Sequence, residues 1–239
     1  MNARTVNVRV VSLVPSSTET LLALGAEVIA CTRFCEQPDL PHVGGTKNPD
    51  LDAIIALHPD VVVMDREENR IEDHDALVEA GIRVFVSDVR SVDDAIALVG
   101  DLTALVDAPA GTYERCLAPE VRRPVVGVAR RTAFVPIWRR PWMSIAARTY
   151  GASLLDLLGI DLVTADLAEP YPTVELEDIA AIRPDLVLVP SEPYVFTAEH
   201  LDELAAAIPG ATIVRIDGQD LFWWGARTPG AIERLGAAI

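Results

Sequence analysis

The sequence lacks the features of membrane-inserted and nucleic-acid-binding proteins. No stretch of its 239 residues approaches the roughly 18 consecutive apolar residues of a membrane span, and the N-terminal segment has no apolar signal-peptide core. Its 36 acidic residues outnumber 20 basic ones, giving a net charge of −16, which argues against nucleic acid or an anionic membrane as a partner. We therefore expect a cytoplasmic protein as the sequence stands, and a periplasmic or cell-surface one if the chain is a trimmed mature form.

Residues suited to metal binding or catalysis are also sparse. The cysteines are too few and odd in number for a disulfide framework, so we expect buried free thiols and a reducing compartment: Cys31, Cys35 and Cys116. The histidines are scattered, with no carboxylate at metal-ligand spacing: His42, His58, His74 and His200. A glycine-rich phosphate loop and a Gly-x-Ser-x-Gly pattern are both missing. The sequence predicts no catalytic residue, no metal site and no cofactor.

A segment of the first half returns in the second half. Residues 50–63 read DLDAIIALHPDVVV, and residues 175–188 read ELEDIAAIRPDLVL, at an offset of 125 residues. In each copy, apolar residues at helical spacing follow an acidic first turn, and a Pro-Asp pair ends the helix. The apolar run that comes next suits a strand buried on both faces of a parallel sheet. Each copy predicts a helix, a tight turn and a strand; chance similarity between two ordinary units is the alternative.

Strand and helix patterns alternate along both halves, and 50% of the residues are hydrophobic, which is ample for a buried core. This pattern predicts an α/β fold with two Rossmann-like lobes, each with a parallel sheet. The expected parts are an N-terminal lobe over residues 1–90, a helical linker over 91–123 and a C-terminal lobe over 124–239. The first strand of the C-terminal lobe is expected at VVGVA, residues 125–129.

The first strand-to-helix turn, SLVPSSTETL, places Ser16 and its polar neighbours at a helix N-terminus. Free N–H groups there can hold an anion. A Ser or Thr N-cap with Glu19 in the first turn explains the same residues without a ligand, and is the favoured interpretation.

Aromatic residues are few, only 13 in all, and many fall in predicted loops of the second half. In open α/β sheets, loops at the carboxyl ends of the strands bind ligands, and aromatic side chains there suit a flat, partly apolar molecule. For about half of these residues we weigh a simple role in covering the rim of the core. Two glutamates, Glu67 and Glu192, follow the repeated strands at equal distances.

Four segments together resemble the substrate-binding proteins of ABC importers for cobalamin and iron-siderophores: VVSLVPSSTETLLALG, VGGTKNPDLDAIIALHPDVVV, YPTVELEDIAAIRPDLVLVPSEPY and DGQDLFWWGARTPG. The resemblance spans nearly the whole chain. It implies two lobes joined by a long helix, a ligand cleft between them, and an acid on each lobe that docks onto a membrane permease. Asp52 and Glu177 match the docking positions, and Tyr171 matches an aromatic wall position. The linker is expected to be shorter than in the family, because Pro109, Gly111 and Pro119 interrupt it.

The resulting hypothesis is a monomeric, non-enzymatic binding protein that captures a cobalamin-like or ferric-siderophore-like molecule, with an ABC permease as its partner. A cytoplasmic enzyme, a metallochaperone or a ligand-scavenging or regulatory module on the same scaffold is the alternative. The candidate ligand-binding residues are Ser16, Arg66, Glu67, Trp138, Arg139, Trp142, Tyr171, Glu192, Tyr194, Trp223 and Trp224.

Overall fold

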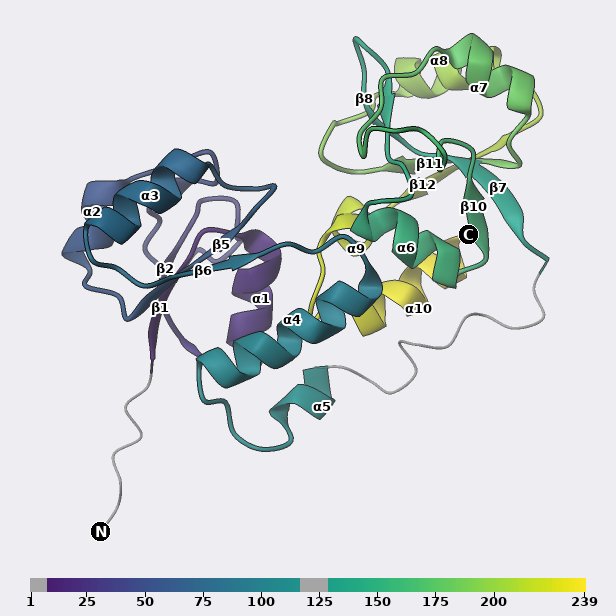
Figure 1. Ribbon diagram of the computed structural model, residues 1–239. Helices are drawn as coiled ribbons and strands as arrows, with labels where there is room; N and C mark the ends of the chain where they lie inside the picture. Colours follow the sequence, from purple (N-terminus) through teal and green to yellow (C-terminus); the bar gives the residue numbers. More distant parts are fainter. Residues whose placement is uncertain (1–7, 117–128) are drawn as a thin grey trace. The chain divides into compact units, whose positions relative to one another are not determined.

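The computed structural model describes residues 8–116 and 129–239, and the chain divides into two compact units (Figure 1). The described part of the first unit comprises residues 8–89, 93–116 and 224–227. The second unit comprises residues 90–92, 129–223 and 228–239. Each unit therefore contains a short segment from a distant part of the chain.

The first unit is built on a parallel sheet of strand order β2-β1-β5-β6. Helices α2 and α3 lie side by side in this unit (Figure 1). The strands are β1 (Arg9–Ser12), β2 (Glu27–Cys31), β5 (Val61–Asp65) and β6 (Val84–Ser87), with a small hairpin of β3 (Gly44–Gly45) and β4 (Asn48–Pro49). The helices are α1 (Pro15–Ala23), α2 (Leu51–Ala56), α3 (Ile71–Glu79), α4 (Val92–Leu105) and α5 (Thr112–Cys116).

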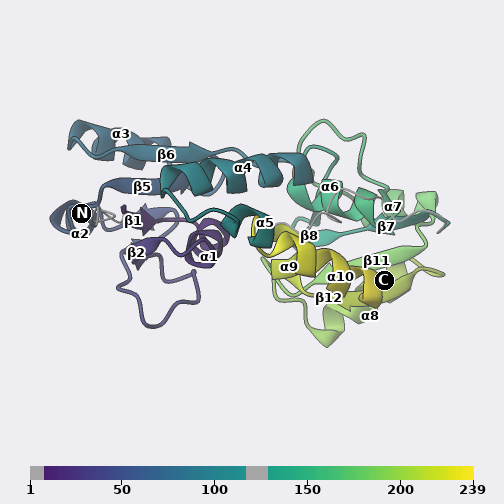
Figure 2. The same ribbon diagram turned by 90° about the horizontal axis from the view of Figure 1, so that it is seen from below.

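The second unit is built on a parallel sheet of strand order β10-β7-β11-β12. Its helices α9 and α10 lie next to each other, as Figure 2 shows from below. The strands are β7 (Arg131–Phe134), β10 (Ile160–Leu162), β11 (Leu186–Pro190) and β12 (Thr212–Ile216), with a hairpin of β8 (Pro136–Trp138) and β9 (Met143–Ser144). The helices are α6 (Tyr150–Leu157), α7 (Leu176–Ile182), α8 (Ala198–Ala207), α9 (Gly218–Phe222) and α10 (Thr228–Ala238).

The repeated segments occupy equivalent places in the two units, which confirms the predicted helix, turn and strand in each half. Helix α2 leads into β5 and helix α7 leads into β11. Both strands are second from the sheet edge and pair with the first strand of their unit, β1 or β7. The predicted α/β class and parallel sheets are likewise confirmed.

The core of each unit lies around its repeated strand. Every residue of β5 and of β11 is buried. In the first unit Ile54 of α2 packs with Val62 and Met64, and in the second unit Ile179 of α7 packs with Val187. The continuous apolar runs of the sequence are thus strands covered on both faces, as parallel sheets require.

Helix α1 begins differently from the prediction. Its N-cap is Val14, whose side chain makes no capping hydrogen bond, so the predicted Ser or Thr cap is wrong. Pro15 takes the first helical position, where its fixed φ suits the helix and its missing N–H costs nothing. The hydroxyl of Thr18 donates instead to the Val14 carbonyl at 2.8 Å, and the first turn contains no acid, so Glu19 lies beyond it.

The second unit contains strands that the sequence pattern did not reveal. The strand expected over residues 125–129 lies outside the described residues except for Ala129, which is not in a strand. Strand β7 covers Arg131–Phe134, and Phe134 is fully buried. Strand β10 has only three residues and was not predicted.

The region predicted as a linker, residues 91–123, contains α4 and α5 and extends into residues outside the described part. Helix α4 has 14 residues, which corresponds to about 21 Å. The shortening of the connection relative to the family stays a prediction. Within residues 8–116 and 129–239, no helix combines the length and the apolar character needed to cross a bilayer.

We expect Ile54→Ala and Ile179→Ala each to lower the free energy of unfolding by about 2–5 kcal/mol, because both side chains are almost fully buried against equivalent strands. The matched control is Ile182→Ala on α7, since Ile182 is exposed, and its effect should stay within about 0.5 kcal/mol. Urea-induced unfolding measures all three. A cost for Ile179→Ala no larger than that of the control would contradict the equivalence of the two helices.

Candidate ligand-binding site

An aromatic cluster lies past the carboxyl ends of β7 and β11 in the second unit. The hairpin β8–β9 continues directly from β7 and contacts β11, and the Tyr194 loop follows β11. The rings of Trp138 and Tyr194 meet edge-on with their centroids 5.1 Å apart, and the ring centroids of Tyr194 and Phe196 are 4.8 Å apart. Phe196 in turn stacks on Trp142 at 6.0 Å with the planes 2° apart. Three predicted ligand residues, Trp138, Trp142 and Tyr194, thus belong to one cluster.

The cluster is anchored at one end and open at the other. Phe196 is buried in the core of the second unit, and Trp142 packs against that core. Tyr194 is half-buried, and Trp138 is 44% exposed. An exposed indole held edge-on by a fixed neighbour offers a preformed apolar surface, so little conformational entropy would be lost when a flat ligand stacks on it.

Arg139 supports this cluster rather than extending from it. Its guanidinium lies over the Trp142 ring, 5.8 Å from the centroid, and pairs with Glu203 of α8 at 2.7 Å. The Arg139 side chain is only 18% exposed. His200 also belongs to the cluster, because its ring centroid lies 5.7 Å from that of Tyr194. The Nδ1 atom of His200 accepts a hydrogen bond from the Thr197 N–H. Phe196 and His200 belong to the cluster but are not among the candidate ligand-binding residues predicted from the sequence.

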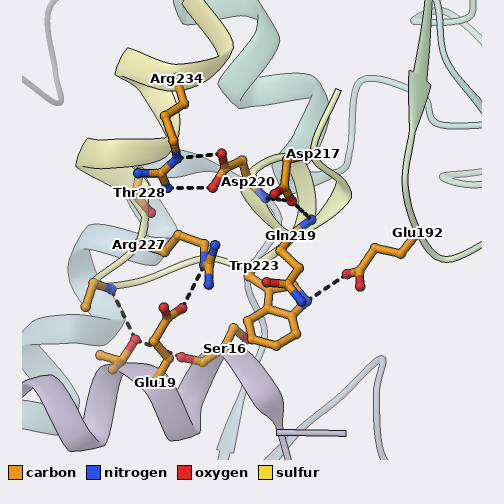
Figure 3. A network of polar contacts seen from close by, with 12 residues as sticks. Ser16, Glu19, Glu192, Asp217, Gln219, Asp220, Trp223, Arg227, Thr228 and Arg234 are labelled. Atoms are coloured by element: carbon orange, nitrogen blue, oxygen red, sulfur yellow. Dashed lines mark hydrogen bonds and ion pairs between the residues drawn. The ribbon is translucent and has the colours of Figure 1, made fainter. Parts of the chain in front are cut away.

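Glu192 is held firmly in the loop that follows β11. Its Oε1 accepts a hydrogen bond of 2.8 Å from the indole N–H of Trp223 (Figure 3). A Cβ atom on Gly218 would lie 2.5 Å from the Cγ of Glu192 and 2.6 Å from its backbone nitrogen, so only glycine fits there. The Gly218 N–H also donates to Ser191 Oγ at 2.9 Å. The loops after β11 and β12 therefore lock together around Glu192.

The short helix α9, which precedes Trp223, is fixed at its N-terminus and at its middle residue. Asp217 caps it by accepting the N–H groups of Gln219 and Asp220 (Figure 3). The buried Asp220 carboxylate pairs with Arg234 of α10 through two hydrogen bonds of 2.7 and 2.6 Å. This bidentate pair compensates the burial of the carboxylate and fixes the position of the helix that leads to Trp223.

The adjacent residues Trp223 and Trp224 belong to different units. Trp224 lies in the segment 224–227, which is part of the first unit, and it is buried. That segment is fixed on α1, because Arg227 pairs with Glu19 at 2.9 Å and the Ala226 N–H donates to Thr20 Oγ1 (Figure 3). Ser16, a predicted ligand-binding residue on α1, is buried.

The loop after β5 is the counterpart of the Glu192 loop. Buried Asp65 organises it by accepting the N–H of Glu67 at 2.9 Å and the hydroxyl of Ser87 at 2.7 Å. Burial raises the pKa of Asp65, and these hydrogen bonds partly offset that rise. Asn69 ties the loop to the Leu13 and Thr46 carbonyls.

Two candidate residues protrude from this loop. Arg66 and Glu67 are both exposed, and Lys47 donates to the backbone carbonyl of Glu67. Arg66 reaches Asp88 only at 3.4 Å, with 71% of its side chain exposed. Their backbone is therefore fixed, while the long side chains extend into solvent.

The remaining candidates lie apart from these groups. Tyr171 is 40% exposed in the segment between β10 and α7. Asp52 and Glu177 are exposed in the first turns of α2 and α7, where the helix dipole favours a negative charge. In the described part of the chain, no three residues of the metal-ligating types come together.

Comparisons with known proteins agree with this arrangement. The sequence pattern of the family described as "Periplasmic binding protein" matches residues 10–207. A vitamin B12-binding protein of Yersinia pestis is 25% identical over 235 residues, which cover 92% of this chain and 81% of that protein.

Solved structures share the fold. The periplasmic vitamin B12 binding protein BtuF of Vibrio cholerae superposes with a TM-score of 0.78 at 18% identity, covering 97% of this chain and 96% of its own. An ABC transporter substrate-binding protein from Listeria monocytogenes gives 0.80 at 16% identity, with 98% of each chain covered. The periplasmic heme-binding protein RhuT from Roseiflexus sp. RS-1 gives 0.78 at 20%, with 97% of each chain covered. Since the family pattern spans most of the sequence, this chain belongs to the periplasmic binding protein family and is a substrate-binding protein.

Proposed function

We propose that this protein reversibly captures a cobalamin-like or ferric-siderophore-like molecule and delivers it to an ABC permease, without catalysing a reaction. The observation that carries the proposal is the partly exposed aromatic cluster at the carboxyl edge of the second sheet, in a member of a family of transport binding proteins. Relatives named for vitamin B12 and for heme support a large, flat, partly apolar ligand. Work in the periplasm or at the cell surface is part of this proposal.

The chemistry of the site suits such a ligand in two ways. The outer face of Trp138 provides stacking area, which contributes about 0.5–1.5 kcal/mol beyond simple burial. Glu192, locked in place after β11, provides a charged acceptor beside that sheet edge for hydrogen-bond donors of the ligand. In the first unit, the exposed side chains of Arg66 and Glu67 follow β5 and offer one charge of each sign to polar groups.

The primary test is titration of the purified protein with a corrinoid and with a panel of ferric siderophores, followed by tryptophan fluorescence and ligand absorbance. We expect one of the two classes to quench the emission saturably. Comparing the corrinoid titration with the siderophore titrations shows which of the two ligand classes binds. If neither class quenches the emission of the folded protein, the proposed function is wrong.

Trp138→Ala should weaken binding of the ligand so identified about tenfold, or roughly 1.4 kcal/mol, because the variant removes the exposed stacking face. Trp138→Phe should retain most of the affinity. Ile182→Ala is the matched control. It removes an exposed apolar side chain at the end of α7, before the amino end of β11 and away from the aromatic cluster. Equal dissociation constants for Trp138→Ala and the control would exclude Trp138 from the site.

Gly218→Ala should reduce both stability and affinity, because the added methyl group overlaps the backbone and Cγ of Glu192 and forces the two loops apart. Overpacking of this kind costs about 1–3 kcal/mol. The control is Gly100→Ala in α4, where the new Cβ meets Tyr113 only at 3.6 Å and the substitution should stabilise the helix slightly. Thermal unfolding and ligand titration are measured on both variants; unchanged affinity in Gly218→Ala would show that the position of Glu192 is unimportant for binding.

Asp52→Arg and Glu177→Arg should each reduce cellular uptake of the ligand at least about tenfold while leaving its dissociation constant unchanged. Reversing a charge at a docking surface turns an attraction to the permease into a repulsion. Glu199→Arg, an exposed first-turn acid of α8, is the control for charge alone and should preserve uptake. Normal uptake in both docking variants would remove these two acids from the permease interface.

A further inference from the structure

Two cysteines of the first unit, Cys31 and Cys35, form a pair of buried thiols. Cys31 is the last residue of β2, and Cys35 lies four residues later in the turn that follows. Both are free thiols, buried to 0% and 2% exposure, and their sulfur atoms are in hydrogen-bond contact. The third cysteine, Cys116 on α5, is a separate buried thiol.

The surroundings of the pair are polar and asymmetric. The sulfur of Cys35 lies 3.2 Å from the Thr18 hydroxyl and 3.2 Å from the Thr32 hydroxyl. Thr18 belongs to the N-terminal half of α1, where the helix dipole favours a negative charge. The hydrogen bonds from Cys31, Thr18 and Thr32 lower the pKa of Cys35. The hydrogen bond to Cys35 and burial raise the pKa of Cys31. Cys35 is therefore the more acidic thiol of the two.

The backbone around the pair is already folded back on itself. The Cys35 N–H donates to the Thr32 carbonyl at 3.1 Å, and the Arg33 N–H donates to the Gly44 carbonyl at 3.0 Å. Arg33 and Phe34 extend from this turn with the guanidinium 4.7 Å from the ring centroid, and Phe34 is 49% exposed. A disulfide between Cys31 and Cys35 would covalently close the turn that carries Arg33 and Phe34.

We propose that Cys31 and Cys35 are a redox modification site, at which hydrogen peroxide converts the two thiols into an intramolecular disulfide. The Cys35 thiolate attacks one peroxide oxygen; an S–O bond forms, the O–O bond breaks, and the released hydroxide takes up a proton to become water. The sulfur of Cys31 then attacks Cys35, forming the S–S bond and breaking the S–O bond. The proton of Cys31 leaves with the departing hydroxide as a second water, so the thiol pair loses two electrons in total.

Burial explains the choice of oxidant and of the partner thiol. Hydrogen peroxide is a small oxidant, as suits a cysteine that is only 2% exposed, and the Cys31 thiol is already hydrogen-bonded to Cys35. Among residues 8–116 and 129–239, no hydroxyl is found hydrogen-bonded to Cys116 like those around Cys35, and burial raises the pKa of Cys116. Oxidation should therefore select Cys31 and Cys35 and leave Cys116 reduced.

The sequence supplies a direct test with the full chain. Trypsin cleaves after Arg33, which lies between the two cysteines, and yields peptides 10–33 and 34–47. The reduced protein is treated with hydrogen peroxide or buffer, denatured with N-ethylmaleimide, and analysed by intact mass and by tryptic mapping. We expect three maleimide adducts before oxidation and one after it. The two peptides should be linked after oxidation and separate on reduction.

Serine variants assign the roles of the two sulfurs. With Cys31→Ser, a dimedone probe should trap sulfenic acid on Cys35; with Cys35→Ser, it should trap none on Cys31. Cys116→Ser is the matched control and should leave the linked peptides unchanged. Three adducts after peroxide, a link through Cys116, or a disulfide between two chains would each overturn the proposal. The opposite trapping pattern would overturn the assignment of Cys35 as the attacking thiolate.

Discussion

Burial of the two repeated strands is the constraint on which each unit depends. Strands β5 and β11 are covered along their whole lengths, and Ile54 or Ile179 closes one face. A fully buried Val, Leu or Met contributes about 1.5–3 kcal/mol relative to an exposed one, so these short strands account for much of the stability of their units. Parallel pairing on both sides satisfies their backbone groups and directs the carboxyl ends of neighbouring strands to one edge.

That edge is where the fold places polar and aromatic side chains on fixed supports. Past β11, Glu192 is locked by Gly218 and by the Trp223 indole, and Tyr194 rests on buried Phe196. Past β5, Asp65 organises the equivalent loop while its neighbours extend into solvent. Rigid loops lose little conformational entropy on binding, which suits the capture of a ligand.

Much of this could be predicted from sequence wherever the signal was local. The two helix-strand repeats and the parallel sheets follow from apolar runs and their spacing, whereas the family was identified by the resemblance of four segments; all three are confirmed. Strand β7 escaped prediction because RTAF is short and begins with polar residues, and three-residue β10 has too little pattern to detect. The fit of Gly218 against Glu192 joins residues 26 positions apart, so only tertiary structure reveals it. The predicted Ser or Thr N-cap of α1 is wrong because Pro15, rather than a side-chain hydroxyl, fixes the start of that helix.

The path of the chain makes the two units interdependent. The first unit includes residues 224–227, where Arg227 pairs with Glu19 and Gly225 adopts a φ of 98°. A Cβ on Gly225 would lie 2.1 Å from the Thr20 hydroxyl oxygen, so this close approach depends on glycine. Conversely, the second unit includes residues 90–92, and the Val92 N–H donates to Ser153 Oγ at 3.1 Å. Each unit thus lacks part of its packing until the other half of the chain is present, so a break between the halves would leave two incomplete folds rather than two independent domains.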